Sequence, residues 1–336
     1  MAKRIASLLD ADNRVQVRST SQEGSAPGRL DDSRILKERG PKNSVDPFRP
    51  YHMLVEPEFC ADGQVEDVAT VFLSNRECPF RCLMCDLWKN TTDDRVSVGA
   101  IPKQIRHALK HLPPARHIKL YNSGNFFDAQ AIPPEDFAEI GSLVSDFTTV
   151  IVENHPRLCN DRCIEFQDLC GNQLEVALGL ETSHQPTLQQ LNKQMTTDDF
   201  IRACEFLRKH DIQVRAFILL KPPDTSEEQG IERALESVRF AFDHGVNCCS
   251  VIPTRAGNGI MDRLQQIGLF QPPQLRSLEI VMDESLRWNG GRVFADLWEA
   301  RQFAECAACA TARIERLNTI NLTQQASPPV ECSHCG

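Results

Sequence analysis

Six short apolar segments alternate with helical segments between residues 68 and 253, and this alternation constrains the fold most strongly. Short apolar runs bounded by polar residues are typical of buried strands. Strands that alternate with helices form a parallel sheet, which is either open and doubly wound or curved into a barrel. We expect these strands at residues 68–75, 117–122, 148–153, 174–180, 213–220 and 248–253.

The segments between the strands show helical periodicity and helix-start signals. Thr197 begins one such segment with two acidic residues in its first turn, and Ser226 begins another with Ser-Glu-Glu. In a parallel sheet of either kind, ligands bind beyond the carboxyl ends of the strands, so polar residues there are the candidates for a site. We expect helices at residues 102–111, 134–145, 197–210 and 226–244, and mostly helical structure after 255, at 271–287 and 294–304.

Three parts of the chain differ in composition. Residues 1–45 are rich in Ser, Arg, Asp and Gly and lack an apolar period, which predicts a mobile N-terminal tail. Residues 46–260 hold the alternating pattern, and residues 261–336 form a mainly helical C-terminal extension.

The charge and hydropathy of the chain restrict its partners and location. The net charge is −9, which does not favour tight unaided binding of nucleic acid. The sequence has neither an apolar run of about 18 residues nor the apolar core of a secretion signal. We therefore expect a cytoplasmic protein without membrane spans.

Cysteine is abundant for a cytoplasmic protein, with 14 residues, and its spacing favours metal binding over disulfides. Cys78, Cys82 and Cys85 follow the first predicted strand in one short loop. Three thiolates can ligate three irons of a 4Fe–4S cluster and leave the fourth iron open. A zinc ion would need a fourth ligand, which His107 or His111 supplies only if the chain folds back.

The C-x3-C-x2-C loop after the first strand of a six-strand chain resembles the radical S-adenosylmethionine (SAM) superfamily. Three further segments narrow the resemblance: Tyr121-Asn-Ser-Gly-Asn-Phe-Phe-Asp128, Leu174-Glu-Val-Ala-Leu-Gly-Leu-Glu-Thr182 and Leu219-Leu-Lys-Pro-Pro223. They are similar to the branch that holds the Elongator catalytic subunit, and most similar to the radical SAM subunit of archaeosine synthase. Both of those proteins act on tRNA.

The resemblance implies a partial (β/α)6 TIM-like barrel and a specific cofactor chemistry. Cys78, Cys82 and Cys85 would ligate a 4Fe–4S cluster, and SAM would chelate its fourth iron. Reductive cleavage of SAM would yield a 5′-deoxyadenosyl radical, with a flavodoxin or ferredoxin as the expected electron donor. The cofactors supply the chemistry, while the protein positions and shields them.

The resemblance also indicates which residues would contact SAM. Met84 would lie against adenine in the place of the family's usual aromatic residue, and Ile252 would pack on the same ring. Ser123, Gly124 and Asn125 occupy the place of the segment that grips the SAM amino group. The remaining candidates, for the ribose hydroxyls or the SAM carboxylate, are Glu153, Glu181, Ser183 and Arg215.

Two of these residues have structural alternatives. Glu153 could instead pair with Arg157, and Arg215, which lies inside the fifth strand, could form an outward ion pair. Lys221 and Arg255 are further cations near the strand ends that could bind a phosphate or carboxylate. The sequence nominates no acid–base catalytic residue.

A second cysteine cluster lies at the C-terminus. Cys306 and Cys309 form one C-x2-C knuckle, and Cys332 and Cys335 form another, 22 residues further on. This pattern predicts a four-cysteine site for zinc or for an auxiliary iron–sulfur cluster. Arg313 and Arg316, between the knuckles, would face RNA or solvent.

Three functions remain in competition at this stage. The first is a radical SAM enzyme that modifies tRNA or another RNA, together with a partner subunit. The second is a radical SAM enzyme for a small molecule or a peptide, which a closed apolar pocket at the barrel mouth would favour, whereas a basic rim would favour RNA. The third is a structural metal-binding interaction protein, which predicts zinc at both cysteine sites.

Overall fold

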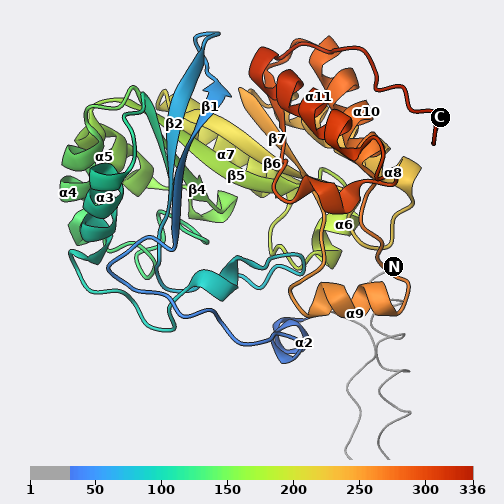
Figure 1. The fold of residues 1–336 in the computed structure, drawn as a ribbon. Coiled ribbons are helices and arrows are strands. Elements are labelled where there is room, and N and C mark those ends of the chain that lie inside the picture. The colour runs from blue at the N-terminus through green and yellow to red at the C-terminus, as the bar shows by residue number, and fades with distance from the viewer. Residues whose placement is uncertain (1–30, 336) are drawn as a thin grey trace, which may run out of the picture.

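The six predicted strands are all present, and they are consecutive members of one curved sheet (Figure 1). The computed structural model describes residues 31–335. Neighbouring strands from β2 to β7 are parallel, as the alternation with helices predicts. Their bounds are β2 (Val65–Phe72), β3 (His117–Tyr121), β4 (Thr149–Asn154), β5 (Gln173–Glu181), β6 (Gln213–Leu220) and β7 (Cys248–Pro253).

Two further strands complete an eight-stranded sheet in the described residues. β1 (His52–Phe59) is antiparallel to β2, and β8 (Arg292–Ala295) is parallel to β7. The sequence conceals both, because β1 carries Pro57 and three ionisable side chains and β8 has only four residues. The predicted helix at 294–304 is wrong: its first two residues belong to β8, and only a 3-10 turn (Ala300–Phe303) follows.

Most of the helices follow strands and cover the outer face of the sheet (Figure 1). Capping boxes start two of them, with Thr196 and Asp199 at α7 and with Ser226 and Gln229 at α8. The helices are α2 (Asp32–Lys37), α3 (Ala100–His111), α4 (Phe137–Val144), α5 (Asp161–Cys170), α6 (Gln185–Gln190), α7 (Thr197–Lys209), α8 (Glu227–Asp243), α9 (Ile260–Gln266), α10 (Leu275–Arg287) and α11 (Ala310–Thr323). Short 3-10 turns are Leu87–Asn90, Pro134–Asp136 and Pro156–Leu158.

A large apolar core lies between the sheet and these helices. Alternate strand residues such as Val150, Val152 and Leu174 are fully buried in it, and three phenylalanine rings, Phe126, Phe137 and Phe166, pack within 6 Å of one another. Burial of this kind supplies most of the driving force for folding.

Ionisable side chains from five strands form a charged layer near the amino ends of the parallel strands. The layer comprises Glu58, Lys119, Glu175, Arg215 and Arg292. Arg215 donates to Glu175 Oε1 at 2.6 Å and to Glu58 Oε1 at 2.7 Å, and Arg292 lies 3.1 Å from Glu175. Burial alone would raise the pKa of Glu58, but Arg215 and Lys119 hold it well below the ordinary range. Each charge in the layer is therefore compensated within the protein.

The C-terminal extension closes the edge of the sheet at β8. The side-chain amide of Asn321 in α11 accepts from Ala295 N at 2.8 Å and donates to Ala295 O at 2.9 Å. Gln324 makes the same pair of bonds to Val293, at 2.7 and 3.0 Å. The extension thus contributes a strand to the sheet and covers its free edge, across the predicted boundary at residue 260.

The predicted N-terminal tail lies partly outside the described residues. Residues 1–30 are not described, but residues 31–45 include α2 and pack on the core, with Ile35 only 1% exposed. The carboxyl ends of the parallel strands point toward α2 and α9 in Figure 1, so this segment lies near the expected ligand-binding edge.

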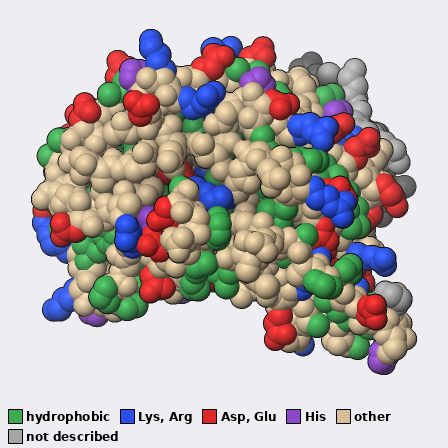
Figure 2. All heavy atoms as spheres, turned by 90° about the horizontal axis from the view of Figure 1, so that it is seen from above, with side chains coloured by type: hydrophobic (Ala, Val, Ile, Leu, Met, Phe, Trp, Pro, Cys, Tyr) green, Lys and Arg blue, Asp and Glu red, His purple; other side chains and the backbone are tan. Residues whose placement is uncertain are grey.

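The opposite end of the molecule carries both signs of charge. Figure 2 views the face where the β1–β2 turn lies and shows Lys and Arg interspersed with Asp and Glu, without a broad patch of either sign on that face. Among the described residues, no helix has the length and apolar character needed to cross a membrane.

Candidate metal centres

The loop that carries Cys78, Cys82 and Cys85 leaves the carboxyl end of β2 and is largely buried. Cys82 is 8% exposed, and the other two thiols are half-buried. Burial raises the pKa of Cys78 to about 11 and the pKa values of Cys82 and Cys85 to about 12. Buried thiols of this kind become thiolates when they ligate a metal, because binding displaces the proton.

Two asparagines from distant loops hold the backbone of this cysteine loop. Asn192 Nδ2 donates to Arg81 O at 2.8 Å, and Asn258 Nδ2 donates to Leu83 O at 2.7 Å and to Cys85 O at 3.1 Å. A backbone bond from Leu83 N to Leu191 O, at 2.8 Å, adds a third attachment. The loop is irregular in itself, so these contacts fix its shape.

The spacing of the thiols distinguishes the two cysteine sites. The ligand atoms of Cys306, Cys309, Cys332 and Cys335 all lie within 4.8 Å of one another, whereas those of Cys78, Cys82 and Cys85 do not form such a group. A single ion draws its ligands close together, while a 4Fe–4S cube takes one thiolate at each of several irons. The residues of the first loop therefore fit a cluster better than one ion.

The segment after β3 adjoins the first cysteine. Asn125 Nδ2 donates to Cys78 Sγ at 3.1 Å, and a Cβ added at Gly124 would stand 3.5 Å from Cys78 Cβ. Ser123 has a φ of 52° and shares a 2.8 Å hydrogen bond with the hydroxyl of Tyr51. The side-chain amide of Asn122 is fully buried and has no hydrogen-bond partner among the described residues. This fits a site in which a bound polar group supplies the missing partner.

Glu153, at the end of β4, shapes this segment. Its Oε1 accepts from Asn122 N at 2.6 Å and from Gly124 N at 3.4 Å. Burial raises the pKa of Glu153 to about 7, although these backbone bonds act in the opposite direction. The predicted alternative partner, Arg157, donates instead to Gln194 O at 2.9 Å.

A buried ion pair lies at the end of β5. Lys193 Nζ is 2.6 Å from Glu181 Oε1, and both side chains are less than 10% exposed. A Cβ added at Gly179 would stand 2.3 Å from Lys193 Nζ and 2.5 Å from Glu181 Oε1, so any other residue would displace the pair from its present position. Burial alone would lower the pKa of Lys193, but Glu181 and the nearby Cys82 raise it above the ordinary value.

Met84 and Ile252, the predicted adenine contacts, pack against the same group of apolar side chains. Both are half-buried against a small apolar cluster that includes Leu83 and Leu219. An apolar, partly exposed surface made by two flexible side chains suits the face of a planar ring.

Ser183 and Arg215 lie elsewhere. Ser183 N donates to Ser237 Oγ of α8 at 2.9 Å. Arg215 belongs to the charged layer near the start of β6 and is 2% exposed, with both of its partner carboxylates in that layer. Lys221 pairs with Glu227 at 2.5 Å and Arg255 with Asp296 at 3.1 Å, so each of these cations has a carboxylate partner within the chain.

The sequence reasoning missed Lys193, Asn192 and Asn258. None of them belongs to a recognisable spacing pattern, because each reaches the site from a loop that is distant in the sequence. The available signal was their position in the connections that follow β5 and β7, since ligands bind at that edge of the sheet.

The four C-terminal cysteines form the second predicted site. Cys306 Sγ is 4.0 Å from Cys332 Sγ, and Cys309 Sγ is 3.7 Å from Cys335 Sγ. Tetrahedral zinc with Zn–S bonds of about 2.3 Å places its sulfurs about 3.8 Å apart, so the observed distances fit one zinc ion. Cys309 immediately precedes α11, which anchors the first knuckle.

Arg313 and Arg316 are buried beside this site and link α11 to α10. Both are 7% exposed and pair with Glu279 of α10, and Arg316 also pairs with Asp283 at 2.8 Å. Arg313 Nε donates to Cys309 Sγ at 3.3 Å. The expectation that these arginines face RNA or solvent is therefore wrong, because α10 and the C-terminal segment enclose them.

Comparisons with known proteins give relatives but no matching family model. Archaeosine synthase subunit beta from Methanosarcina acetivorans is 27% identical over 72% of this chain and 74% of the relative. Its counterpart from Thermococcus kodakarensis is 26% identical over 64% of this chain and 69% of the relative.

Solved structures also match. Elp3 from Methanocaldococcus infernus has a TM-score of 0.49 at 14% identity, over 65% of this chain and 59% of that one. Coproporphyrinogen III oxidase from Escherichia coli, a radical SAM enzyme, has a TM-score of 0.44 at 13% identity, over 72% of this chain and 53% of that one. The chain thus spans less than two thirds of either solved structure. The resemblance predicted from the sequence is confirmed by the two curated relatives: the chain is similar in sequence to archaeosine synthase subunit beta.

Proposed function

We propose that this protein is a radical SAM enzyme that binds a 4Fe–4S cluster through Cys78, Cys82 and Cys85. The observation that carries the proposal is the cysteine loop itself. Its thiols, one buried and two half-buried, lie at the carboxyl end of β2 and are more widely spread than the ligands of one ion. The likeness to archaeosine synthase subunit beta supports the same chemistry. When bound, the cluster and SAM supply a 5′-deoxyadenosyl radical, with one electron from a low-potential donor of the flavodoxin or ferredoxin type.

Different residues around the loop would bind different parts of SAM. Ser123, Gly124 and Asn125 would bind the amino group, and Glu153 holds that segment in shape through its backbone N–H groups. Glu181, fixed by Lys193, would accept hydrogen bonds from the ribose. Met84 and Ile252 would exclude water from adenine. We assign no cofactor role to Arg215 and Ser183, because other side chains already engage both.

The C-terminal cysteines would bind zinc rather than an auxiliary cluster. The sulfur distances of 3.7 and 4.0 Å support a single tetrahedral ion. Such an ion would stabilise the terminal knuckle, since metal binding in a site of this kind contributes directly to folding.

The proposed substrate is tRNA or another RNA, bound together with a partner subunit. The names of the relatives support this, because they describe one subunit of archaeosine synthase. The net charge of −9 fits a chain that depends on a partner for RNA affinity. A cytoplasmic location would keep its thiols reduced and available to metals.

Cleavage of SAM tests the enzyme proposal directly. Anaerobic, iron-loaded protein is mixed with dithionite and SAM, and 5′-deoxyadenosine is measured by chromatography with and without tRNA. We expect slow cleavage by the protein alone, faster cleavage with tRNA and the partner subunit, and none by the Cys78→Ala/Cys82→Ala/Cys85→Ala variant. Cleavage that responds to a small molecule or peptide but not to RNA would favour the second candidate function. An absence of cleavage in every mixture would contradict the enzyme proposal.

A further inference from the structure

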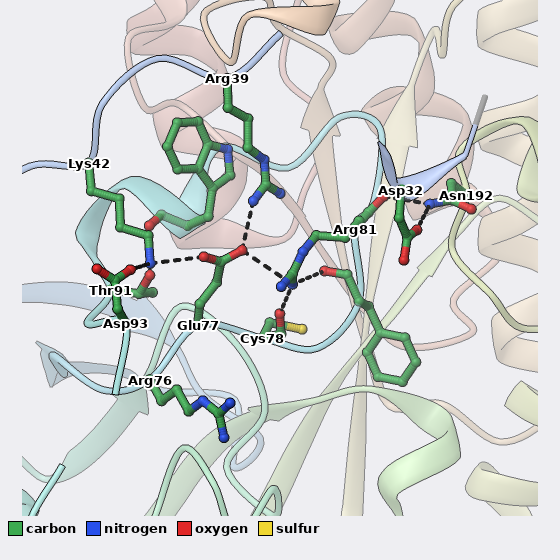
Figure 3. Close-up of polar contacts among 12 residues, drawn as sticks. Asp32, Arg39, Lys42, Arg76, Glu77, Cys78, Arg81, Thr91, Asp93 and Asn192 are labelled. Atoms are coloured by element: carbon green, nitrogen blue, oxygen red, sulfur yellow. Dashed lines mark hydrogen bonds and ion pairs between the residues drawn. The ribbon is translucent and has the colours of Figure 1, made fainter. Parts of the chain in front are cut away.

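Glu77 precedes the first cysteine of the loop, and its carboxylate forms ion pairs with three cationic side chains (Figure 3). Its carboxylate lies 2.7 Å from Arg39 Nη1, 2.9 Å from Lys42 Nζ and 3.2 Å from Arg81 Nη1. Arg81 belongs to the cysteine loop and also donates to Cys78 O. Arg39 and Lys42 come from the N-terminal segment, about 40 residues earlier in the chain.

Residues 31–42, which we name the N-terminal strap, contact the loop along their length. Asp32 Oδ1 accepts from Asn192 Nδ2 at 2.7 Å, and the same Asn192 holds Arg81 O. Ile35 is 1% exposed and packs in the apolar cluster that contains Leu83. The strap therefore reaches the cysteine loop both through a shared asparagine and through apolar packing.

The middle of the strap is fixed from two sides. The Arg39 guanidinium lies 4.7 Å from the centre of the Trp88 ring, in addition to its bond with Glu77. A Cβ added at Gly259 would stand 1.9 Å from Glu38 O, so the loop after β7 approaches the strap too closely for any other residue. This packing is specific, because Gly259 also has a φ of 92°, which favours glycine.

We propose that the N-terminal strap positions the cysteine loop for cluster binding, with Arg39 as its central positioning residue. This inference rests on the proposed function. The loop has no regular secondary structure between Glu77 and Asp86, so its shape depends on contacts from outside it. Arg39 is the only residue of the strap that joins Glu77 to Trp88, on opposite sides of the cysteine segment, among the contacts described here.

The strap also sets the charge beside the cluster. Three cationic side chains surround the single carboxylate of Glu77, which leaves an excess of positive charge. The exposed Asp93, 2.7 Å from Lys42, offsets only part of that excess. Net positive charge near a redox centre favours its reduced, more negative form. Removal of the Arg39 charge should therefore lower the midpoint potential of the cluster.

Arg39→Ala tests the inference, with Arg39→Lys as the conservative variant and Arg106→Ala as the matched control. Arg106 pairs with Glu139 on the surface, away from the cysteine loop. Lys42→Ala is a second variant that removes a more exposed cation. Three quantities are measured: iron loss under a chelator, midpoint potential by EPR-monitored titration, and hydrogen exchange of residues 76–86 in the metal-free protein. Zinc content and melting temperature report whether each variant folds.

We expect Arg39→Ala to lose iron several-fold faster, to shift the midpoint potential downward and to exchange faster in the loop. Arg39→Lys should restore the midpoint potential more fully than it restores the protection of the loop from hydrogen exchange. Lys42→Ala should shift the midpoint potential in the same direction as Arg39→Ala. Wild-type values in Arg39→Ala for all three quantities would overturn the inference. If the wild-type chain binds no iron, the proposed function fails, and loop exchange alone decides whether the strap positions the loop.

Discussion

At the scale of single residues, Gly179 illustrates how the site depends on the absence of a side chain. The Lys193–Glu181 pair occupies the space that a Cβ would take, and Glu181 itself has a φ of 63°. A buried ion pair gives little net stability, but it fixes the direction of a carboxylate. The direction of the Glu181 carboxylate is therefore set by a lysine and a glycine that sequence patterns do not reveal.

Gly179→Ala should impair SAM binding without removing the cluster. A cost of about 1–3 kcal/mol, which is typical of overpacking at a buried position, corresponds to about 5- to 150-fold in affinity when it falls on the SAM-bound arrangement. Equilibrium dialysis with iron-loaded protein measures the SAM affinity, and iron analysis measures the cluster. Ser142→Ala is the control, because Ser142 is exposed on α4, outside the site. Unchanged SAM affinity in Gly179→Ala would contradict the role of the Glu181–Lys193 pair.

Glu58→Gln should destabilise the protein by about 3 kcal/mol at neutral pH, because it leaves Arg215 and Lys119 short of a partner. The pKa of Glu58 is lower in the folded than in the unfolded protein. Its contribution is therefore complete above the ordinary carboxylate pKa of about 4.3 and is lost as the pH falls through the lower folded value.

The difference between wild type and Glu58→Gln should accordingly shrink in acid. Urea denaturation at neutral pH, and at about pH 4 and below, measures this difference in the free energy of unfolding. The exposed Glu56 lies on the same strand, and Glu56→Gln should change little at any pH. A Glu58→Gln difference that stays constant into strong acid would exclude the ion-pair explanation.

Some site residues were predictable and others were not, for a physical reason. The cysteines, Met84 and the Ser123–Asn125 segment follow strands directly, so local sequence and strand order place them. The sequence offered an ion pair as the alternative role of Arg215, and the structure shows that pair buried, with Glu58 and Glu175 as partners that the sequence did not identify. Partners brought by distant loops, such as Asn258, leave no local pattern.

At the scale of elements, the predicted strands match because each is an apolar run within a regular βα alternation. β6 and β7 have the predicted bounds. β1 escapes prediction because an edge strand tolerates Pro57 and charges, and β8 escapes because four residues are too few to show a period. The helices α2, α5 and α6 were not predicted, whereas α9 and α11 fall within the general expectation of helical structure after residue 255.

Asn321→Ala should expose the dependence of β8 on α11. The variant leaves the N–H and C=O of the buried Ala295 without the partners that Asn321 provides, which costs about 1–3 kcal/mol. Thermal unfolding followed by circular dichroism measures the loss. Asn318→Ala on the same helix is the control, because Asn318 is exposed. Equal melting temperatures for the two variants would show that the side-chain amide does not secure the sheet edge.

At the scale of the whole molecule, two cysteine sites lie in different parts of one fold. The N-terminal strap and the loops after β3, β5 and β7 surround the first, whereas α10 and α11 enclose the second. The ligand atoms of the four C-terminal cysteines lie within 4.8 Å of one another, whereas those of Cys78, Cys82 and Cys85 form no such group. The proposed function therefore depends on which metal each site binds.

Metal analysis of matched cysteine variants tests this claim most directly. Iron, sulfide and zinc are measured on anaerobically prepared wild type, on Cys78→Ala/Cys82→Ala/Cys85→Ala and on Cys306→Ser/Cys309→Ser. We expect about four irons and one zinc per chain in the wild type. The first variant should lose the iron and keep the zinc, and the second should lose the zinc and keep the iron. Zinc without iron in the wild type, or iron that survives in the first variant, would contradict the account.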